Sequence, residues 1–409
     1  MKHILVSIIL LFVSSSYALA DGIILRDTVS LSPSCRLKYD LLNSETFRYH
    51  PVNGVDFQES ATLFYNPDSA SVFSSSVRLQ YATLPHIFEP ELALSYAYDN
   101  RHTFSLVAGR ELHDWKQDPN TEMRWIKNTF SALFAHKNYK IVIDKKYFTS
   151  SYTFKPTPKS LVKISYDRYD ITPMRNHSTF SIVRNGDDFK ANTPQNNHVD
   201  SAQVLNKRSG VSAITLASEF PICNNQHSPL LGIDLRYINH VKVFHPQISL
   251  SQSVSYSKVY MTHWEINGGL FSGGDSKSLS FHEWYHIQSS RKLLPTRDKL
   301  TGVVGLVSQH PYSFSTNDWH IDASLRLFRP RVILLQIPVL NQFFLGESIT
   351  LTTIYTKQNN KLYSEIGYEL LNVLDSFHLG VFCSFNGKEY NETNIRLGVV
   401  PKNIWKRKK

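Results

Sequence analysis

Cysteine is scarce in this chain of 409 residues, which has only Cys35, Cys223 and Cys383, far apart in the sequence. An odd number of cysteines without a C-x-x-C pair argues against a zinc ribbon and a disulfide framework, and predicts buried thiols or one optional bridge. G-x-S-x-G, P-loop and G-x-G-x-x-G spacings are also missing, so the usual signatures of serine hydrolases and of phosphate-binding proteins are lacking. No cofactor and no metal are expected.

Long apolar runs are missing as well. The most apolar later stretch, 332–345, is short and contains Pro338, so it does not predict a membrane helix. The N-terminus has two basic residues, an apolar core over 4–13 and small residues up to Ala20. This order predicts a signal peptide over residues 1–20, and therefore an exported protein.

The chain is basic, with a formal net charge of +10. A basic surface suits nucleic acid or anionic lipid, and an exported protein rarely meets nucleic acid. We therefore expect outer-membrane lipid as a partner, besides another outer-membrane or periplasmic protein, and no nucleic acid. The closing residues 401–409 are expected to be a solvated basic tail.

Apolar and polar residues alternate along most of the chain. In 319–328, Ile321 and Leu325 fall on one face while Asp322 and Arg326 fall on the other, and a period of two over such a length predicts a strand. The same pattern recurs at 91–99, 231–237, 376–385 and 391–399. Turn signals separate these stretches, including 99–100, 184–188, 267–269, 357–360 and 385–389.

Two architectures fit such strands. A soluble sandwich has short strands, whereas a membrane barrel has strands of about 9 to 11 residues or more, with aromatic residues near their ends. The longer stretches here favour an all-β, antiparallel transmembrane β-barrel of roughly 14 to 16 strands over residues 44–400. Residues 21–43 are a short lead or a first strand, and 184–210 is the longest predicted loop, expected outside the cell.

The stretch 281–286, FHEWYH, contains the H-E-x-x-H spacing of zinc proteases. That spacing binds zinc only on a helix, because residues four apart then lie on one face. The alternation in 278–288 predicts a strand instead, which places His282 and His286 about 13 Å apart. No zinc site is therefore expected.

Serine and histidine also occur close together at Ser308 and His310, and at Ser376 and His378. A barrel-resident hydrolase is consequently a low-ranked alternative. No catalytic residue is assigned, because sequence proximity does not establish catalytic geometry.

Charged residues recur on the faces opposite the apolar ones, namely Asp234, Arg236, Asp322, Arg326, Glu365 and Arg396. On the lipid side such residues cost about 2 to 4 kcal/mol at mid-membrane, so they are expected to line the interior. That interior is either a solute path or filled. In a channel, Arg326→Leu and Asp322→Leu should leave folding intact and alter conductance.

Collinear pieces of the chain carry a family resemblance: FRYHPVNGVDF (47–57), FSGGDSKSLSFHEWYH (271–286) and YSFSTNDWHIDASLRLF (312–328). Their order resembles the β-barrel domain of unknown function that, in certain Gram-negative outer membranes, usually follows a carboxypeptidase-regulatory-like β-sandwich domain. The leading sandwich domain is not found in this sequence, and the resemblance implies no catalytic or binding residue.

These observations predict an integral outer-membrane barrel that is not an enzyme and acts as a channel, transport accessory or structural component. The glycine-containing late strands leave an assembly or translocation factor as an alternative. A secreted soluble β-protein is the third.

Overall fold

The structure is a computed structural model that describes residues 25–41, 46–114, 125–138, 140–184, 186–194, 208–223, 228–257, 260–287, 306–309, 312–329, 334–337, 346–373 and 377–399. The predicted signal peptide and basic tail lie outside these ranges. In the described part, no helix is long and apolar enough to cross a membrane.

The chain forms one antiparallel sheet of 18 strands, which confirms the predicted fold class. The strands are β1 Leu25–Ser32, β2 Cys35–Leu41, β3 Phe47–His50, β4 Gly54–Tyr65, β5 Ser71–Ala82, β6 Ile87–Tyr98, β7 His102–Asp114, β8 Val142–Phe154, β9 Leu161–Pro173, β10 Ser209–Pro221, β11 Leu230–Ile238, β12 Val243–Ser257, β13 Tyr260–Gly269, β14 His320–Arg329, β15 Gly346–Thr356, β16 Tyr363–Val373, β17 Phe377–Asn386 and β18 Glu389–Val399. The helix α2, Trp125–Ala135, joins β7 to β8. The number of strands exceeds the prediction because the lead itself contains the hairpin of β1 and β2.

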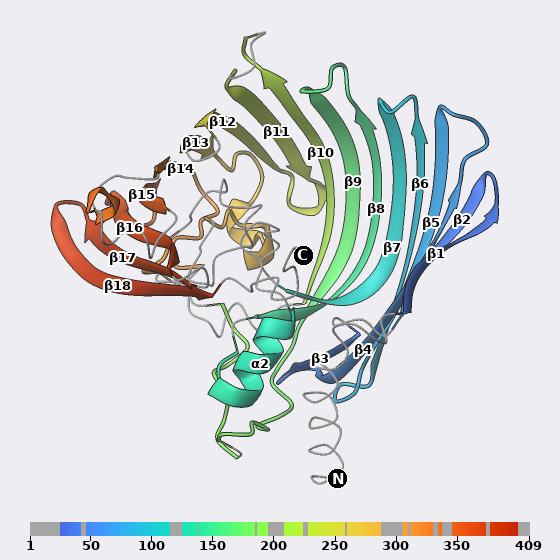
Figure 1. The fold of residues 1–409 in the computed structure, drawn as a ribbon, viewed down its shortest axis with the longest axis horizontal. Helices are drawn as coiled ribbons and strands as arrows, with labels where there is room; N and C mark the ends of the chain where they lie inside the picture. Colours follow the sequence, from blue (N-terminus) through green and yellow to red (C-terminus); the bar gives the residue numbers. More distant parts are fainter. Residues whose placement is uncertain are drawn as a thin grey trace.

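Each strand pairs with the next along the chain, except that β2 and β3 pair with successive halves of the same edge of β4. The sheet therefore has one position fewer than it has strands. With every neighbouring pair antiparallel, β1 and β18 run in the same direction, whereas β2 and β18 run in opposite directions. Among the described residues no pairing joins β18 to β1 or β2, so the curled sheet in Figure 1 is open at this seam.

The convex face of the sheet carries two rows of exposed aromatic side chains. Register aligns Tyr65, Phe73, Tyr96 and Phe104 on β4 to β7 near one end of the sheet, called the upper end, and Phe57, Tyr81 and Phe88 on β4 to β6 near the other, lower end. On each of β4, β5 and β6 the two rows are eight residues apart, about 26 Å along a strand and about 20 Å across a membrane at the usual tilt. This arrangement matches the paired aromatic girdles of membrane barrels.

Between and beyond these rows, most of the convex face is apolar. Exposed side chains that alternate along their strands include Leu79, Leu92, Leu106, Ile164, Ile214, Ile248, Ile266, Ile321, Ile366 and Val381. Charged residues of the convex face gather toward the lower end of β7 to β9, at Arg110, Lys146, Arg168 and Asp170. A largely apolar convex face above them and a polar concave face are the inverse of a soluble barrel and suit lipid outside.

Three local predictions were wrong. Residues 278–288 do not form a strand: their described part contains the 3₁₀ turn Phe281–Glu283 and one isolated bridge at Tyr285. The predicted turn at 267–269 is the end of β13, where a Cβ on Gly269 would lie 2.7 Å from Cε1 of His320. The cysteines are not buried, since Cys223 is exposed and the other two are half-buried, and all three are free thiols.

Candidate functional site

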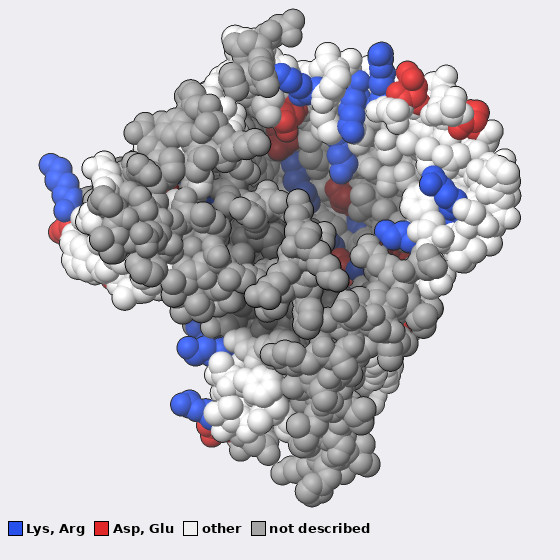
Figure 2. Space-filling view, in the orientation of Figure 1, with Lys and Arg blue, Asp and Glu red and all other residues white. Residues whose placement is uncertain are grey.

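The concave face is lined by ion pairs between strands that are one or two positions apart in the sheet. On one wall, Arg78 contacts Glu91 at 2.7 Å and Glu111 at 3.2 Å. On the opposite wall, Glu369 lies between Arg326, at 3.3 Å, and Arg396, at 3.4 Å. Figure 2 shows acidic and basic side chains gathered around the hollow of the sheet. Opposite charges thus compensate one another within the lumen.

The six charged residues predicted to face the interior lie on the concave side. Asp234 and Arg236 are on β11, Asp322 and Arg326 on β14, and Glu365 and Arg396 on β16 and β18, in line with the alternation of each strand. The structure does not bring all six together. The partner Glu369 was missed, although it lies four residues after Glu365 on the same strand face.

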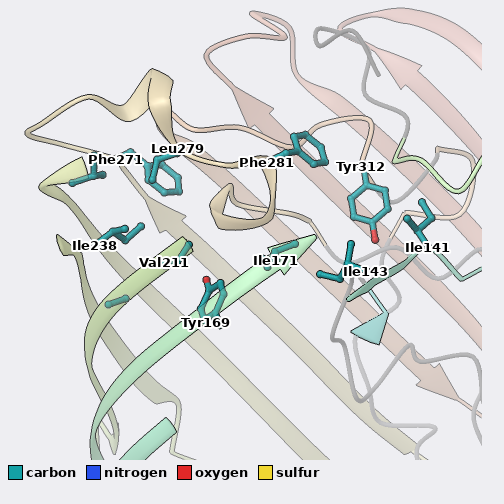
Figure 3. Packing of buried hydrophobic residues seen from close by; sticks show 12 residues of the cluster. Ile141, Ile143, Tyr169, Ile171, Val211, Ile238, Phe271, Leu279, Phe281 and Tyr312 are labelled. Carbon is teal, nitrogen blue, oxygen red and sulfur yellow. The ribbon is translucent and has the colours of Figure 1, made fainter. Parts of the chain in front are cut away.

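A long connection between β13 and β14 enters the lumen. We call its described residues, 270–287, 306–309 and 312–319, the inner segment. Figure 1 shows it between the two halves of the curled sheet. In Figure 3, Phe271, Leu279, Phe281 and Tyr312 lie over side chains of the strand wall. All four are buried in one cluster with wall residues Ile143, Tyr169, Ile171, Val211, Ala213, Ile238 and Val243.

This cluster attracts the inner segment to β8 to β12, and a second one, in which Ile287, Leu306 and Phe314 pack with Ile354 and Tyr363, attracts it to β15 and β16. Fully burying a side chain such as Phe or Leu contributes about 1.5 to 3 kcal/mol relative to exposing it. The inner segment is therefore a packed filling of the lumen.

Three polar contacts fix where the inner segment sits. Arg236 of β11 pairs with Glu283 at 3.0 Å. Three strands further along the sheet, the hydroxyl of Tyr285 donates a hydrogen bond to Asp322 of β14. These two contacts tie the 281–287 part to β11 and β14.

The third contact is a carboxylate that accepts from the backbone. Oε2 of Glu365 accepts from the amide of Val307 at 2.6 Å, and Oε1 accepts from the amide of Ser308 at 3.0 Å and from the hydroxyl of Tyr363 at 2.8 Å. Hydrogen bonds to charged groups are about twice as strong as neutral ones. Glu365 thereby holds the 306–309 part of the inner segment on β16.

Glu283 lies outside the strands, and its carboxyl group is buried. Burial raises the pKa of its carboxyl to about 8, although Lys145 counteracts the effect. The Arg236 contact favours the charged form, but only 2% of the Glu283 side chain is exposed, so desolvation outweighs it. Between pH 4.5 and about 8, Glu283 therefore keeps its proton while the inner segment is seated, whereas a solvated carboxyl would release it.

The H-E-x-x-H residues take structural roles in the inner segment. His282 meets the ring of Tyr169 edge-on, and burial holds the pKa of its imidazole well below the usual range. Nδ1 of His286 lies 2.6 Å from Oγ of Ser315. The 3₁₀ turn ends at Glu283, so the helical turn that the zinc motif requires is not formed.

Within the described ranges, no group of three or more His, Cys, Asp and Glu is placed to hold a metal ion. His310 and Ser376, each one half of a predicted serine–histidine pair, lie outside the described residues. The charged groups of the lumen compensate one another and hold the inner segment.

Comparison with known proteins gives one family match. The model of the family of unknown function (DUF5686) C-terminal domain matches residues 21–221 and 239–370. Among curated proteins, none matches the sequence.

The solved structures that match do so at very low sequence identity. BamA from Haemophilus ducreyi lacking POTRA domains 1–3 matches with a TM-score of 0.44 and 10% identity, covering 94% of this chain and 77% of that chain. A mutant of the Rh. blastica porin matches with a TM-score of 0.36 and 8% identity, covering 84% of this chain and 89% of that chain. The siderophore receptor PirA from Pseudomonas aeruginosa matches with a TM-score of 0.34 and 10% identity, covering 91% and 68% of the two chains.

Proposed function

The chain belongs to the family of unknown function (DUF5686) C-terminal domain, and we propose that it is an outer-membrane channel whose passage is controlled by the inner segment. The observation that carries this proposal is the seating of the inner segment on the charged wall of β11 to β16, through Arg236, Asp322 and Glu365. Polar attachments of this kind can be broken one at a time, which suits a segment that is released as well as held.

The membrane location rests on the convex face. Two aromatic rows on β4 to β6 bracket an apolar band about 20 Å high, near the roughly 25 Å that is usual for outer-membrane barrels. The predicted signal peptide and the barrel fold favour the outer membrane. We further propose that the long connections, which lie at the lower end of the sheet, face the outside of the cell.

A channel in lipid needs a closed sheet, because an unpaired strand edge costs several kcal/mol per unsatisfied group. Closing β18 on β1 would require a parallel pair, whereas β18 and β2 are antiparallel to each other. Removing β1 from its position also leaves an even number of strand positions, as in bacterial barrels. We therefore propose that β18 closes on β2 and that β1 is displaced.

Disulfide mapping tests this closure. With Cys35, Cys223 and Cys383 replaced by serine, Leu37→Cys on β2 is combined with Thr393→Cys or Ile395→Cys on β18. The proposed closure gives an intramolecular disulfide in membranes. Cross-linking of β18 to Val29→Cys on β1 instead would contradict it.

An assembly or translocation factor is the second candidate, and the unpaired edge of β18 favours it. Such a factor offers that edge to another polypeptide. In the same experiment, a mixed disulfide between β18 and a second protein would favour this candidate over the channel.

Two measurements test the channel itself. Outer-membrane extracts should contain a form that migrates faster on a detergent gel before boiling than after it. Proteoliposomes should then take up small solutes faster when Glu365→Gln loosens the inner segment than when Glu91→Gln removes an equal charge from the opposite wall. Equal uptake by the two variants would refute control by the inner segment.

A further inference from the structure

A second apolar surface lies outside the sheet, on α2. Its Ala132 and Leu133 are buried against Tyr49 of β3, together with Phe189, and Val55 and Phe180 pack on the same cluster. Two hydrogen bonds fasten it: Oγ1 of Thr129 accepts from the amide of Tyr49 at 2.9 Å and donates to the Tyr49 carbonyl at 3.2 Å. One face of the helix is thus firmly attached to the edge of the sheet.

The opposite face of α2 is apolar and exposed. Phe130 and Phe134 lie one helical turn apart, stack with their ring centroids 5.9 Å apart and are 45% and 42% exposed. Beside them, Ile182 and Val183 are 45% and 61% exposed. The amide of Ile182 donates to the carbonyl of Leu133 at 2.8 Å, so this pair is held against the helix. We call these four side chains the α2 patch.

The place of α2 on the sheet identifies what covers the α2 patch. Tyr49 pairs with Val55, and Val55 lies two residues before Phe57 on the same strand face. Phe57 belongs to the lower aromatic row, which marks one edge of the lipid band. The helix is therefore attached to the edge of β3, and its buried face packs on the same side of the sheet as Phe57, at the level of the lower aromatic row.

Size and charge favour lipid over protein. The exposed area of four such side chains is on the order of a few hundred Å², well below the about 800 Å² per partner of a stable protein interface. Exposed basic residues, Lys137 and Arg184, flank the α2 patch. Basic side chains are visible at this lower end of the molecule in Figure 2. Aromatic residues bordered by Lys or Arg are the composition of helices that lie in a membrane surface.

We propose that the α2 patch is an interfacial anchor: Phe130, Phe134, Ile182 and Val183 insert into the lipid at the lower rim of the barrel, and Lys137 and Arg184 contact lipid phosphates. The anchor rests on the proposed membrane barrel. It fixes the lower rim, and with it the β7–β8 connection, relative to the bilayer.

Depth-dependent quenching tests the anchor in the full-length protein. In the variant with all three native cysteines replaced by serine, Val183→Cys carries an environment-sensitive fluorophore, and the protein is reconstituted in phosphatidylcholine vesicles with and without phosphatidylglycerol. Ile164→Cys on the convex face of β9 is the lipid control, and Lys159→Cys in the β8–β9 turn is the aqueous control. A nitroxide near the lipid headgroup should quench Val183→Cys, and iodide in water should quench Lys159→Cys.

The outcomes separate the anchor from the barrel. Quenching by lipid nitroxide at both Val183→Cys and Ile164→Cys supports the anchor. Lipid quenching at Ile164→Cys with iodide quenching at Val183→Cys overturns the anchor and leaves the barrel intact, whereas no lipid quenching at either position overturns the membrane barrel itself. Protection of Val183→Cys from both quenchers would show that a protein, including a second copy of this chain, covers the patch.

The basic residues are tested with the same fluorophore. Adding phosphatidylglycerol should increase nitroxide quenching at Val183→Cys, because anionic lipid attracts Lys137 and Arg184. The double substitution Lys137→Gln and Arg184→Gln should remove this dependence on lipid charge while Ile164→Cys is unchanged. An unaltered dependence in the double variant would contradict the phosphate contacts.

Discussion

Glu365→Gln isolates one attachment of the inner segment. Glu365 is buried, and its two carboxylate oxygens accept from the amides of Val307 and Ser308. In glutamine one of these oxygens becomes an NH₂ group, which faces an amide donor and cannot accept from it. Losing one charge-assisted hydrogen bond and weakening the other should cost about 2 to 4 kcal/mol. At about 1.4 kcal/mol per tenfold change, the released form of the 306–309 part rises about 30- to 700-fold.

Hydrogen exchange at these two amides measures the effect directly. In detergent-solubilised protein, exchange at Val307 and Ser308 should speed up by that factor in Glu365→Gln. Exchange should stay as in the wild type in Glu91→Gln, which removes the same charge beside Arg78 on the other wall. Unchanged exchange in Glu365→Gln would refute the view that this carboxylate holds the inner segment.

Three further predictions concern the wall and its charges. Gly367→Ala should lower the temperature at which heat modifiability is lost, by a destabilisation of about 1 to 3 kcal/mol, because its Cβ would lie 2.2 Å from the ring of Phe382. Arg326→Leu should also lower that temperature, since it removes one of two partners of the buried Glu369; an unchanged temperature would restore the sequence-based expectation that folding is unaffected. Raising the pH from 4.5 to about 8 should loosen the inner segment, because Glu283 keeps its proton in this range while the segment is seated and loses it when the segment is released. The loosening is measured as an increase in the protease sensitivity of the inner segment, and the Glu283→Gln variant should lose this pH dependence.

Alternation of side chains was enough to predict the barrel strands. The expected strand 319–328 corresponds to β14, His320–Arg329, and Asp322 and Arg326 lie on the concave face, as the period of two requires. The turns at 99–100 and 357–360 also lie between strands, and the turn predicted at 385–389 contains the two residues, 387–388, that join β17 to β18. These features depend only on residues that are close together in the sequence, so one sequence is enough to predict them.

The inner segment could not be predicted in the same way. Its stretch 278–288 alternates like a strand, and alternate residues such as Leu279, Phe281 and Glu283 are indeed buried, but the backbone forms the 3₁₀ turn Phe281–Glu283 instead. Alternation shows which residues are buried, and it does not show whether a neighbouring strand is present to pair with. The pairing of Glu283 with Arg236 joins residues far apart in sequence, and no local signal specifies it.

Single-channel recording in planar bilayers tests the central claim, that the inner segment controls passage through the lumen. The double variant Arg236→Gln and Glu365→Gln removes two attachments of the inner segment, and Arg78→Gln with Glu91→Gln removes one cation and one anion that bind each other on β5 and β6. The first variant should show more frequent and larger current steps than the wild type, and the second should not. Identical recordings from the two variants, with or without current, would contradict the claim.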